Sequence, residues 1–261
     1  MSGATSEAQP AEPAVLLEQR GATALVTLDR PQTGNAFSAQ LVAGLDGALD
    51  QALRAGAQLV VLKGAGRHLC TGFDLSGIEG QSDGDLLLRL VRIEQLLQKV
   101  ASLPALTLCL GTGRTVGAGA DLFAACDLRV AVSGAHFSFP GVGFGVILGN
   151  RRLAALVGPG AARDILLNAR SLSAEAALTV GLATACVSGA EEAAALADAE
   201  AMVERLSPAT ITALRAATSP PDPDRDLAAL VTAAARPGLR ARILAHRART
   251  LQARASRPEA P

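Results

Sequence analysis

Two glycine-containing turns are the part of the sequence best suited to chemistry. The first, Gly72–Leu75, follows a short apolar run, and the second, Gly111–Gly117, follows another apolar run and opens a helical pattern. If both runs are neighbouring parallel strands, the turns lie together at the carboxyl edge of one sheet. Two backbone N–H groups from separate turns would then form an oxyanion hole that polarises a carbonyl group. Either turn alone is explained by strand endings, and it is the pairing that favours a site.

The second turn also invites comparison with a dinucleotide-binding loop. Glycines in such a loop let the backbone approach a pyrophosphate at a helix N-terminus. Gly111–Gly117 has one residue too many for the G-x-G-x-x-G spacing, and the nearest downstream acid, Asp127, precedes the next strand instead of ending it. A nicotinamide-dependent oxidoreductase is therefore the weaker hypothesis, and binding of NAD(P) would be its test.

Four titratable side chains are candidates for proton transfer. Asp121 follows the second turn, and a position near a helix N-terminus is expected to favour its carboxylate form. A capping or salt-bridged aspartate is the alternative. His68 is expected to be a partly exposed loop residue, and His136 is expected to have a structural role. The alternative for His136 is proton transfer, because an imidazole has an ordinary pKa near 6.5. His246 lies in an Arg-rich segment and is expected to face solvent.

Composition excludes several function classes. Among the 261 residues, 24 basic side chains balance 24 acidic ones, and there is no Trp or Tyr. The chain thus offers neither a basic field for nucleic acid or anionic lipid nor aromatic platforms for bases. The four cysteines are dispersed, with no C-x-x-C pair, which predicts free thiols and no metal site. The first residues lack a signal-peptide pattern and no apolar run has membrane-spanning length, so a cytoplasmic protein is predicted.

The hydrophobic pattern predicts an α/β fold that would position these turns. Leucines recur every four residues after Ser38, a plausible N-cap, and predict an amphipathic helix. Strand, loop and helix alternate, which indicates crossover connections and a parallel sheet. From residue 151 onward the pattern is rich in helices. We expect strands at 14–17, 22–28, 59–62, 105–110 and 128–132, and helices at 86–100 and 117–126.

Several segments, in order, resemble the motifs of the crotonase family, also called the enoyl-CoA hydratase/isomerase family. The resemblance covers about residues 14–187. Gly64–Leu75 resembles the first oxyanion loop of the family, and Val116–Leu122 resembles the second. The other matching segments are Leu28–Pro31 with Asn35–Phe37 for the opening motif, Cys126–Arg129 after the second loop, and Ser173–Ala177 with Gly181 and Leu182 for a later block.

The resemblance implies a fold, a ligand and a set of site residues. The fold would be a spiral of ββα turns over residues 14–190, preceded by a disordered tail (1–13) and followed by a helical region (191–261) that packs in trimers or hexamers. The ligand would be an acyl-CoA or acyl-carrier thioester, with no cofactor besides the coenzyme A of the substrate. Its thioester oxygen would accept from the N–H groups of Phe73 and Ala118. The other implied substrate-binding residues are Arg30 (for the phosphates), Cys70, Gly72, Asp74, Leu75, Gly117 and Gly141.

The catalytic acids depart from the family pattern. Family hydratases place a glutamate after each of two motifs, and here the two positions hold Asp121 and Gly141. Hydration needs one carboxylate to deprotonate water and a second group to protonate the α-carbon. We therefore expect isomerase-type or other enolate chemistry, with Asp121 as the single proton carrier. A non-catalytic acyl-CoA-binding protein is the alternative.

Two groups of arginines allow more than one interpretation. Arg151 and Arg152 stand where many relatives have glycines that line the acyl pocket, and they would pair with a carboxylated substrate or face a trimer interface. The sequence leaves both open. A basic stretch near the C-terminus is expected to be a solvated helix face, in which one or two side chains could meet CoA phosphates. Its members are Arg236, Arg240, Arg242, Arg247, Arg249, Arg254 and Arg257.

Overall fold

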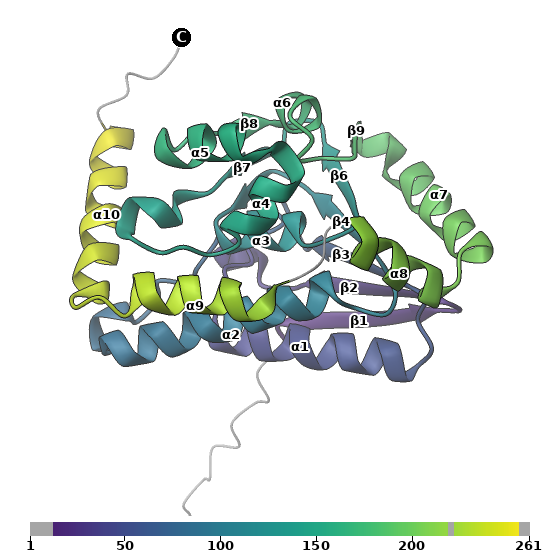
Figure 1. Cartoon of the computed structure of the whole chain (residues 1–261), viewed down its shortest axis with the longest axis horizontal. Helices are drawn as coiled ribbons and strands as arrows, with labels where there is room; N and C mark the ends of the chain where they lie inside the picture. Colours follow the sequence, from purple (N-terminus) through teal and green to yellow (C-terminus); the bar gives the residue numbers. More distant parts are fainter. Residues whose placement is uncertain (1–12, 219–221, 256–261) are drawn as a thin grey trace, which may run out of the picture.

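A six-stranded sheet forms the centre of the computed structural model, which describes residues 13–218 and 222–255 (Figure 1). Its strand order is β1-β2-β3-β4-β6-β9; β1 and β2 pair as an antiparallel hairpin and the other neighbours are parallel. The predicted α/β class and its parallel sheet are confirmed. The strands are β1 (Val15–Arg20), β2 (Thr23–Leu28), β3 (Leu59–Gly64), β4 (Leu106–Gly111), β6 (Leu128–Val132) and β9 (Ala185–Val187). Residues 1–12 of the predicted tail, residues 220 and 221 of the break at 220–223, and Arg257 lie outside the described residues.

Both faces of this sheet are covered, as the uninterrupted apolar strands predict. In β3, Val60 and Leu62 face the larger core cluster, which includes α1 and α2 residues, whereas Leu59 and Val61 face a smaller cluster that includes Ala199 of α7 and Ile211 of α8. Successive side chains of β3 point to opposite faces of the sheet, so this one strand contributes to two separate hydrophobic clusters. The sheet is held from both sides, which fixes the positions of the loops that follow β3 and β4.

Helices α1 (Ala39–Arg54) and α2 (Asp83–Ala101) begin at serine caps. The Ser38 side chain accepts a hydrogen bond from the backbone N–H of Leu41, and Ser82 forms a reciprocal capping box with Asp85. Such side chains satisfy N–H groups that have no partner inside the helix. Of the leucines at four-residue spacing in α1, Leu41, Leu45 and Leu49 are fully buried and Leu53 is partly buried, so the amphipathic prediction is confirmed. Both helices lie along one face of the sheet in Figure 1.

A second, three-stranded sheet was not predicted from the sequence. It has the order β5-β7-β8, with β5 and β7 parallel and β8 antiparallel to β7. Its strands are too short to show a period-2 pattern, which is why they escape prediction. Together with two isolated bridges, this sheet positions the second glycine turn. The strands are β5 (Arg114–Val116), β7 (His136–Ser138) and β8 (Leu172–Ser173).

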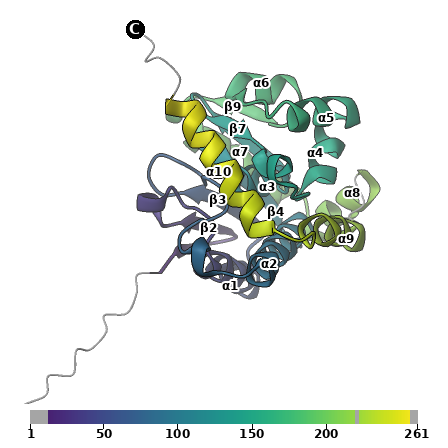
Figure 2. The same ribbon diagram turned by 90° about the vertical axis from the view of Figure 1, so that its left-hand side faces the viewer.

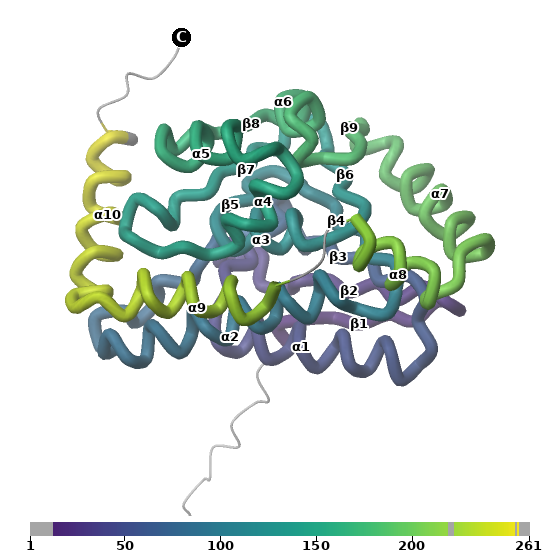
Figure 3. Tube along the Cα trace, in the orientation of Figure 1, coloured from purple at the N-terminus to yellow at the C-terminus, as the bar shows by residue number. Residues whose placement is uncertain are grey.

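The C-terminal half is mainly helical, as predicted. The Arg-rich end of the chain was expected as one segment, but it consists of two helices, α9 and α10. Helix α9 packs beside α2, and α10 runs in a different direction from α9 and packs against η3 and one end of α2 (Figures 1 and 2). The tube in Figure 3 shows the sharp change of direction between them. The remaining helices are α3 (Ala118–Ala124), α4 (Asn150–Val157), α5 (Pro159–Leu167), α6 (Ala174–Thr179), α7 (Glu192–Arg205), α8 (Pro208–Thr218), α9 (Pro223–Ala234) and α10 (Leu239–Ala255), with short 3₁₀ turns η1 (Pro31–Thr33), η2 (Ile78–Gly80), η3 (Pro140–Phe144) and η4 (Gly189–Glu191).

The start of α10 is anchored by one carboxylate from α2. The Asp83 side chain accepts hydrogen bonds from the backbone N–H groups of Gly238, Leu239 and Arg240 at 2.8, 3.1 and 2.8 Å. A carboxylate at a helix N-terminus satisfies free N–H groups and interacts favourably with the helix dipole. The direction of α10 is therefore set by a residue far away in the sequence.

Candidate active site

The two glycine turns meet, as their pairing predicted. Gly72 has a φ of +103°, and a Cβ atom there would lie 3.1 Å from the carbonyl oxygen of Val116. A bridge between Cys70 and Thr115 holds the two segments together, and the backbone N–H of Val116 donates to the Cys70 carbonyl at 2.9 Å. Glycine at position 72 thus allows both the positive φ and the close approach of the two turns.

Phe73 and Ala118 each present a backbone N–H to this junction. Phe73 forms a parallel bridge with Phe37, in which Phe37 bonds to the carbonyl of residue 72 and the N–H of residue 74. The N–H of Phe73 itself therefore points away from Phe37. Ala118 is the first residue of α3, so its N–H has no acceptor within the helix. Within the described residues neither N–H donates a hydrogen bond, and both residues line one cavity.

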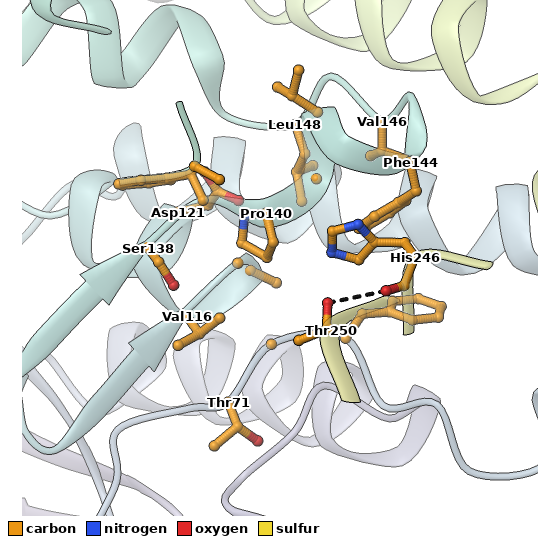
Figure 4. A pocket seen from close by; sticks show the side chains of 18 of the residues that line it. Thr71, Val116, Asp121, Ser138, Pro140, Phe144, Val146, Leu148, His246 and Thr250 are labelled. Atoms are coloured by element: carbon orange, nitrogen blue, oxygen red, sulfur yellow. Dashed lines mark hydrogen bonds between the residues drawn. The ribbon is translucent and has the colours of Figure 1, made fainter. Parts of the chain in front are cut away.

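That cavity has a volume of about 680 Å³ and a largely apolar wall. Leu90 and Ile93 of α2 form one side, the segment around η3 forms another, and Ile243 and Leu251 of α10 close a third. In Figure 4, Asp121 lies on one side of the cavity and His246 on the other, with Pro140 between them. Apolar cavities with a few convergent polar groups are typical of small-molecule sites.

Asp121 is the carboxyl group of this cavity. It lies in the first turn of α3, is 4% exposed, and is the only acidic residue lining the cavity among the residues that the structure describes. Burial raises the pKa of Asp121 well above its ordinary value; the positive charge of Arg152 opposes this rise and the negative charge of Glu94 adds to it. Burial of Asp121 therefore opposes the carboxylate form, which its place near a helix N-terminus was expected to favour.

Comparison with known proteins decides the family. A family model described as "Enoyl-CoA hydratase/isomerase" matches residues 18–236. The chain belongs to the enoyl-CoA hydratase/isomerase family. It is 36% identical over 201 residues to "Probable enoyl-CoA hydratase echA6" of Mycobacterium tuberculosis, a match that covers 75% of this chain and 78% of the relative. It is 32% identical over 188 residues to "Short-chain-enoyl-CoA hydratase" of Clostridium acetobutylicum, which covers 68% and 70% of the two chains.

Solved structures of the enoyl-CoA hydratase/isomerase family confirm the fold. A Bordetella parapertussis structure described as an enoyl-CoA hydratase/isomerase is 42% identical, with a TM-score of 0.85 and coverage of 94% of this chain and 99% of that one. A family structure from Xanthobacter autotrophicus is 26% identical, with a TM-score of 0.78 and coverage of 90% and 98%. The crotonase-like fold expected from the sequence motifs is therefore correct.

Gly141, the position at which the family resemblance expects a second acid, is part of the cavity wall. Gly141 lies in η3 and lines the cavity, but it supplies no side chain. A Cβ atom at Gly141 would lie 3.2 Å from the carbonyl oxygen of Val146, so the wall is already close to this backbone. Gly72, Leu75 and Gly117, three other expected substrate-binding residues, also line the cavity.

Three residues that the family resemblance assigned to substrate binding do not line the cavity. Arg30 donates to Asp74 at 2.9 Å and to the Ala36 carbonyl at 3.2 Å, so its guanidinium is engaged within the fold. Although burial opposes ionisation of Asp74, the hydrogen bond from Arg30 lowers its pKa. Cys70 is fully buried, its sulfur accepts from the Gly72 N–H at 3.3 Å, and burial raises the thiol pKa to about 12. These residues support the first turn from behind.

Arg151 and Arg152 form ion pairs inside the subunit. Arg152 donates to both carboxylate oxygens of Glu94 at 2.9 and 2.6 Å, and Arg151 donates to Asp226 at 2.7 Å. Neither arginine lines the cavity. The structure thus gives both side chains partners within α2 and α9, and it offers no support for their pairing with a carboxylated acyl group.

The histidines fall in different surroundings. His246 does not face solvent as expected: it lines the cavity and packs against Phe144 with ring centroids 5.2 Å apart, and burial lowers its pKa. His68 is partly exposed, as predicted, and accepts from the Arg114 N–H at 3.0 Å. His136 is exposed at the rim of the same cavity. The sequence signal for His246 was present in the spacing of Ile243, His246, Thr250 and Leu251, but abundant arginine masked it.

The dinucleotide hypothesis loses its structural basis. Strand β5 separates β4 from α3, so Gly111–Gly117 is not a single turn from a strand into a helix. A dinucleotide loop requires that direct connection. Within the described residues no group of three or more His, Cys, Asp or Glu side chains is placed to hold a metal ion, and no helix there is long and apolar enough to cross a membrane.

Proposed function

We propose that this protein binds an acyl-CoA thioester with the thioester oxygen between the N–H groups of Phe73 and Ala118, and that it stabilises an enolate there. The single observation that carries the proposal is the convergence of these two unpaired donors with Asp121 in one apolar cavity. Donors aimed at a developing oxyanion in a site of low dielectric constant stabilise charge far more than they do in water. The thioester fits because its carbonyl becomes that oxyanion when the α-carbon loses a proton.

For the reaction we propose isomerisation of the double bond of an enoyl thioester. The Asp121 carboxylate takes a proton from C2 of a 3-enoyl thioester, and the electron pair of that C–H bond passes into a dienolate whose oxygen is held by the two donors. The protonated Asp121 then returns the proton to C4, which yields the 2-enoyl thioester and restores the carboxylate. One carboxyl suffices, because the same group accepts and returns the proton. A pKa raised by burial makes its carboxylate form a stronger base.

Hydration is the weaker proposal for this site, although relatives carry hydratase names. Addition of water needs a second proton-transferring group, and the position that would hold it is Gly141. The same observation favours a second candidate function, a protein that binds acyl-CoA without turnover. We retain the expected homotrimer or hexamer as a proposal, supported by exposed leucines on, or directly after, helices of the C-terminal half, namely Leu167, Leu206 and Leu214.

Turnover of matched trans-2- and trans-3-enoyl-CoA thioesters tests the proposal, with products identified by mass. Isomerisation predicts conversion without a change in mass and its loss in Asp121→Asn. Ala118→Pro removes the second donor at a helix position that accepts proline, so it should lower kcat by about 10²–10³-fold while the protein stays folded. A gain of one water would show hydration instead. Binding of acyl-CoA without turnover across the panel would favour the binding protein.

A further inference from the structure

The buried pair formed by Arg152 and Glu94 lies behind Asp121 and joins three helices. Arg152 is on α4, Glu94 is on α2, and Asp226 on α9 accepts a further bond from the Arg152 Nη1 at 3.4 Å. The Glu94 side chain is 1% exposed. Nη1 donates to Glu94 and Asp226 and Nη2 donates to Glu94, so Nε is the one guanidinium nitrogen of Arg152 that has no partner.

Two of the polar atoms in this region have no hydrogen-bond partner. Within the described residues only three buried side-chain nitrogen or oxygen atoms lack one, and they include Oδ1 of Asp121 and Nε of Arg152. One is an acceptor and the other is a donor, so their requirements are complementary. An unpaired buried polar atom costs about 1–3 kcal/mol, and two of them in one site call for a reason.

The charged groups that act on Asp121 come from several elements. Arg152 of α4 favours its ionised form and Glu94 of α2 opposes it, whereas Asp226 of α9 acts through its contact with Arg152. Cys70, on the loop after β3, holds its thiol proton because burial raises its pKa to about 12, so it adds no charge near neutral pH. Arg152 is therefore the only positive charge that acts on Asp121 within the described residues.

We propose that the Nε–H of Arg152 is the partner that Asp121 gains when it ionises, so that Arg152, held in place by Glu94, is a positioning residue for the proton exchange of Asp121. With Asp121 protonated, both atoms stay unpaired; with Asp121 ionised, its side chain turns so that they join in a charge-assisted bond. Glu94 fixes the guanidinium and competes with Asp121 for its charge. The importance of Asp121 in this inference rests on the proposed function, but the experiment that tests the inference does not depend on that function.

Direct titration of Asp121 by carboxyl infrared difference spectroscopy tests the inference without any substrate. The signal is assigned by its loss in Asp121→Asn. In Arg152→Gln/Glu94→Gln, which removes both charges together, the acid dissociation constant of Asp121 should fall at least tenfold. In Glu94→Gln, which releases Arg152 from its competitor, the constant should rise at least threefold.

Two comparisons separate positioning from packing. Arg151→Gln alters the adjacent, more exposed arginine of α4 and should leave the dissociation constant of Asp121 within twofold of its original value. Arg152→Lys keeps the charge without Nε–H and should reproduce most of the fall. An unchanged or increased constant in the double variant, or shifts of the same sign in the double variant and in Glu94→Gln, would overturn the inference. Neither result depends on turnover, so a failure of the proposed reaction is seen separately.

Discussion

Gly149 and Asp121 are in direct contact across the gap between two helices: a Cβ atom on Gly149 would overlap Oδ1 of the Asp121 carboxyl group. Gly149 precedes α4 and has a φ of +67°, a conformation that side chains other than glycine rarely adopt. The absence of a side chain at Gly149 therefore leaves the space in which the Asp121 carboxyl lies. The contact also links Asp121 to the helix that carries Arg152.

Gly149→Ala should displace Asp121 and lower turnover by at least tenfold. The backbone strain alone should cost about 1 kcal/mol of stability, and the overlap should add about 1–3 kcal/mol. Gly134→Ala is the matched control, because Gly134 also has a positive φ, of +83°, but its added Cβ would meet nothing within 4 Å. Steady-state kinetics and chemical denaturation of both variants check the prediction. Equal turnover in the two variants would contradict it.

Gly141→Glu should give the enzyme the second acid that hydration requires. Gly141 does not have a positive φ, so the backbone accepts a side chain, and the Val146 carbonyl at 3.2 Å from the added Cβ must move by a few tenths of an ångström. Water addition to a trans-2-enoyl-CoA should rise about a hundredfold above that of Gly141→Gln, since general acid–base groups typically contribute about 10²–10⁴-fold. Similar hydration rates for Glu and Gln at this position would exclude the proposed role of the missing carboxyl.

Asp121→Asn should make the protein more stable at neutral pH. Because the folded-state pKa of Asp121 is raised, the folded chain binds more protons than the unfolded chain between the ordinary value near 3.9 and the raised value. Stability of the original protein therefore falls as pH rises through that window, by about 1.4 kcal/mol per pH unit, and the variant lacks this loss. Denaturation at a series of pH values from pH 4 upward measures the difference in stability, which should grow with pH until the raised pKa is passed. If Asp121→Asn were less stable than the original protein at pH 7, the prediction that burial raises the pKa of Asp121 would be wrong.

Asp83→Ala should loosen α10 and weaken acyl-CoA binding. Hydrogen bonds from the backbone, led by that of Arg240, lower the pKa of Asp83, so the cap is present above the ordinary pKa of an aspartate and is lost as pH falls through the lowered value. Hydrogen exchange in residues 239–251 should quicken about fivefold at neutral pH. Asp224→Ala, an exposed acid in the first turn of α9, is the control and should change neither exchange nor binding. Unchanged exchange in Asp83→Ala would refute the anchoring role.

Much of the fold could be predicted because its long elements carry periodic patterns. The serine cap and leucine spacing of α1 and the apolar run of β3 are local signals, and the structure confirms them. The short strands β5, β7 and β8 have no such signal, and their positions depend on pairing partners far away in the sequence. The helices and strands could thus be predicted where the local sequence pattern determines them.

The site was predicted in part for the same reason. Glycine turns that end strands are visible in the sequence, and the family resemblance named Phe73 and Ala118, which both line one cavity. Burial is a property of the whole fold, so the rise in the pKa of Asp121 was not foreseen and His246 was assigned to solvent. The partners of Arg30 and Arg152, Asp74 and Glu94, lie 44 and 58 positions away, a distance over which the sequence alone pairs no charges.

The cap that Asp83 places on α10 also sets an order of events during synthesis. Asp83 and Gly238 are 155 positions apart, so a ribosome that adds about 5–20 residues per second leaves Asp83 waiting for roughly 8–30 s before the backbone that it binds has been made. Before that interval ends, the strands of the sheet and both glycine turns have been synthesised, whereas the wall formed by Ile243 and Leu251 does not yet exist. Translation therefore completes the two glycine turns first and the part of the cavity wall that α10 supplies last.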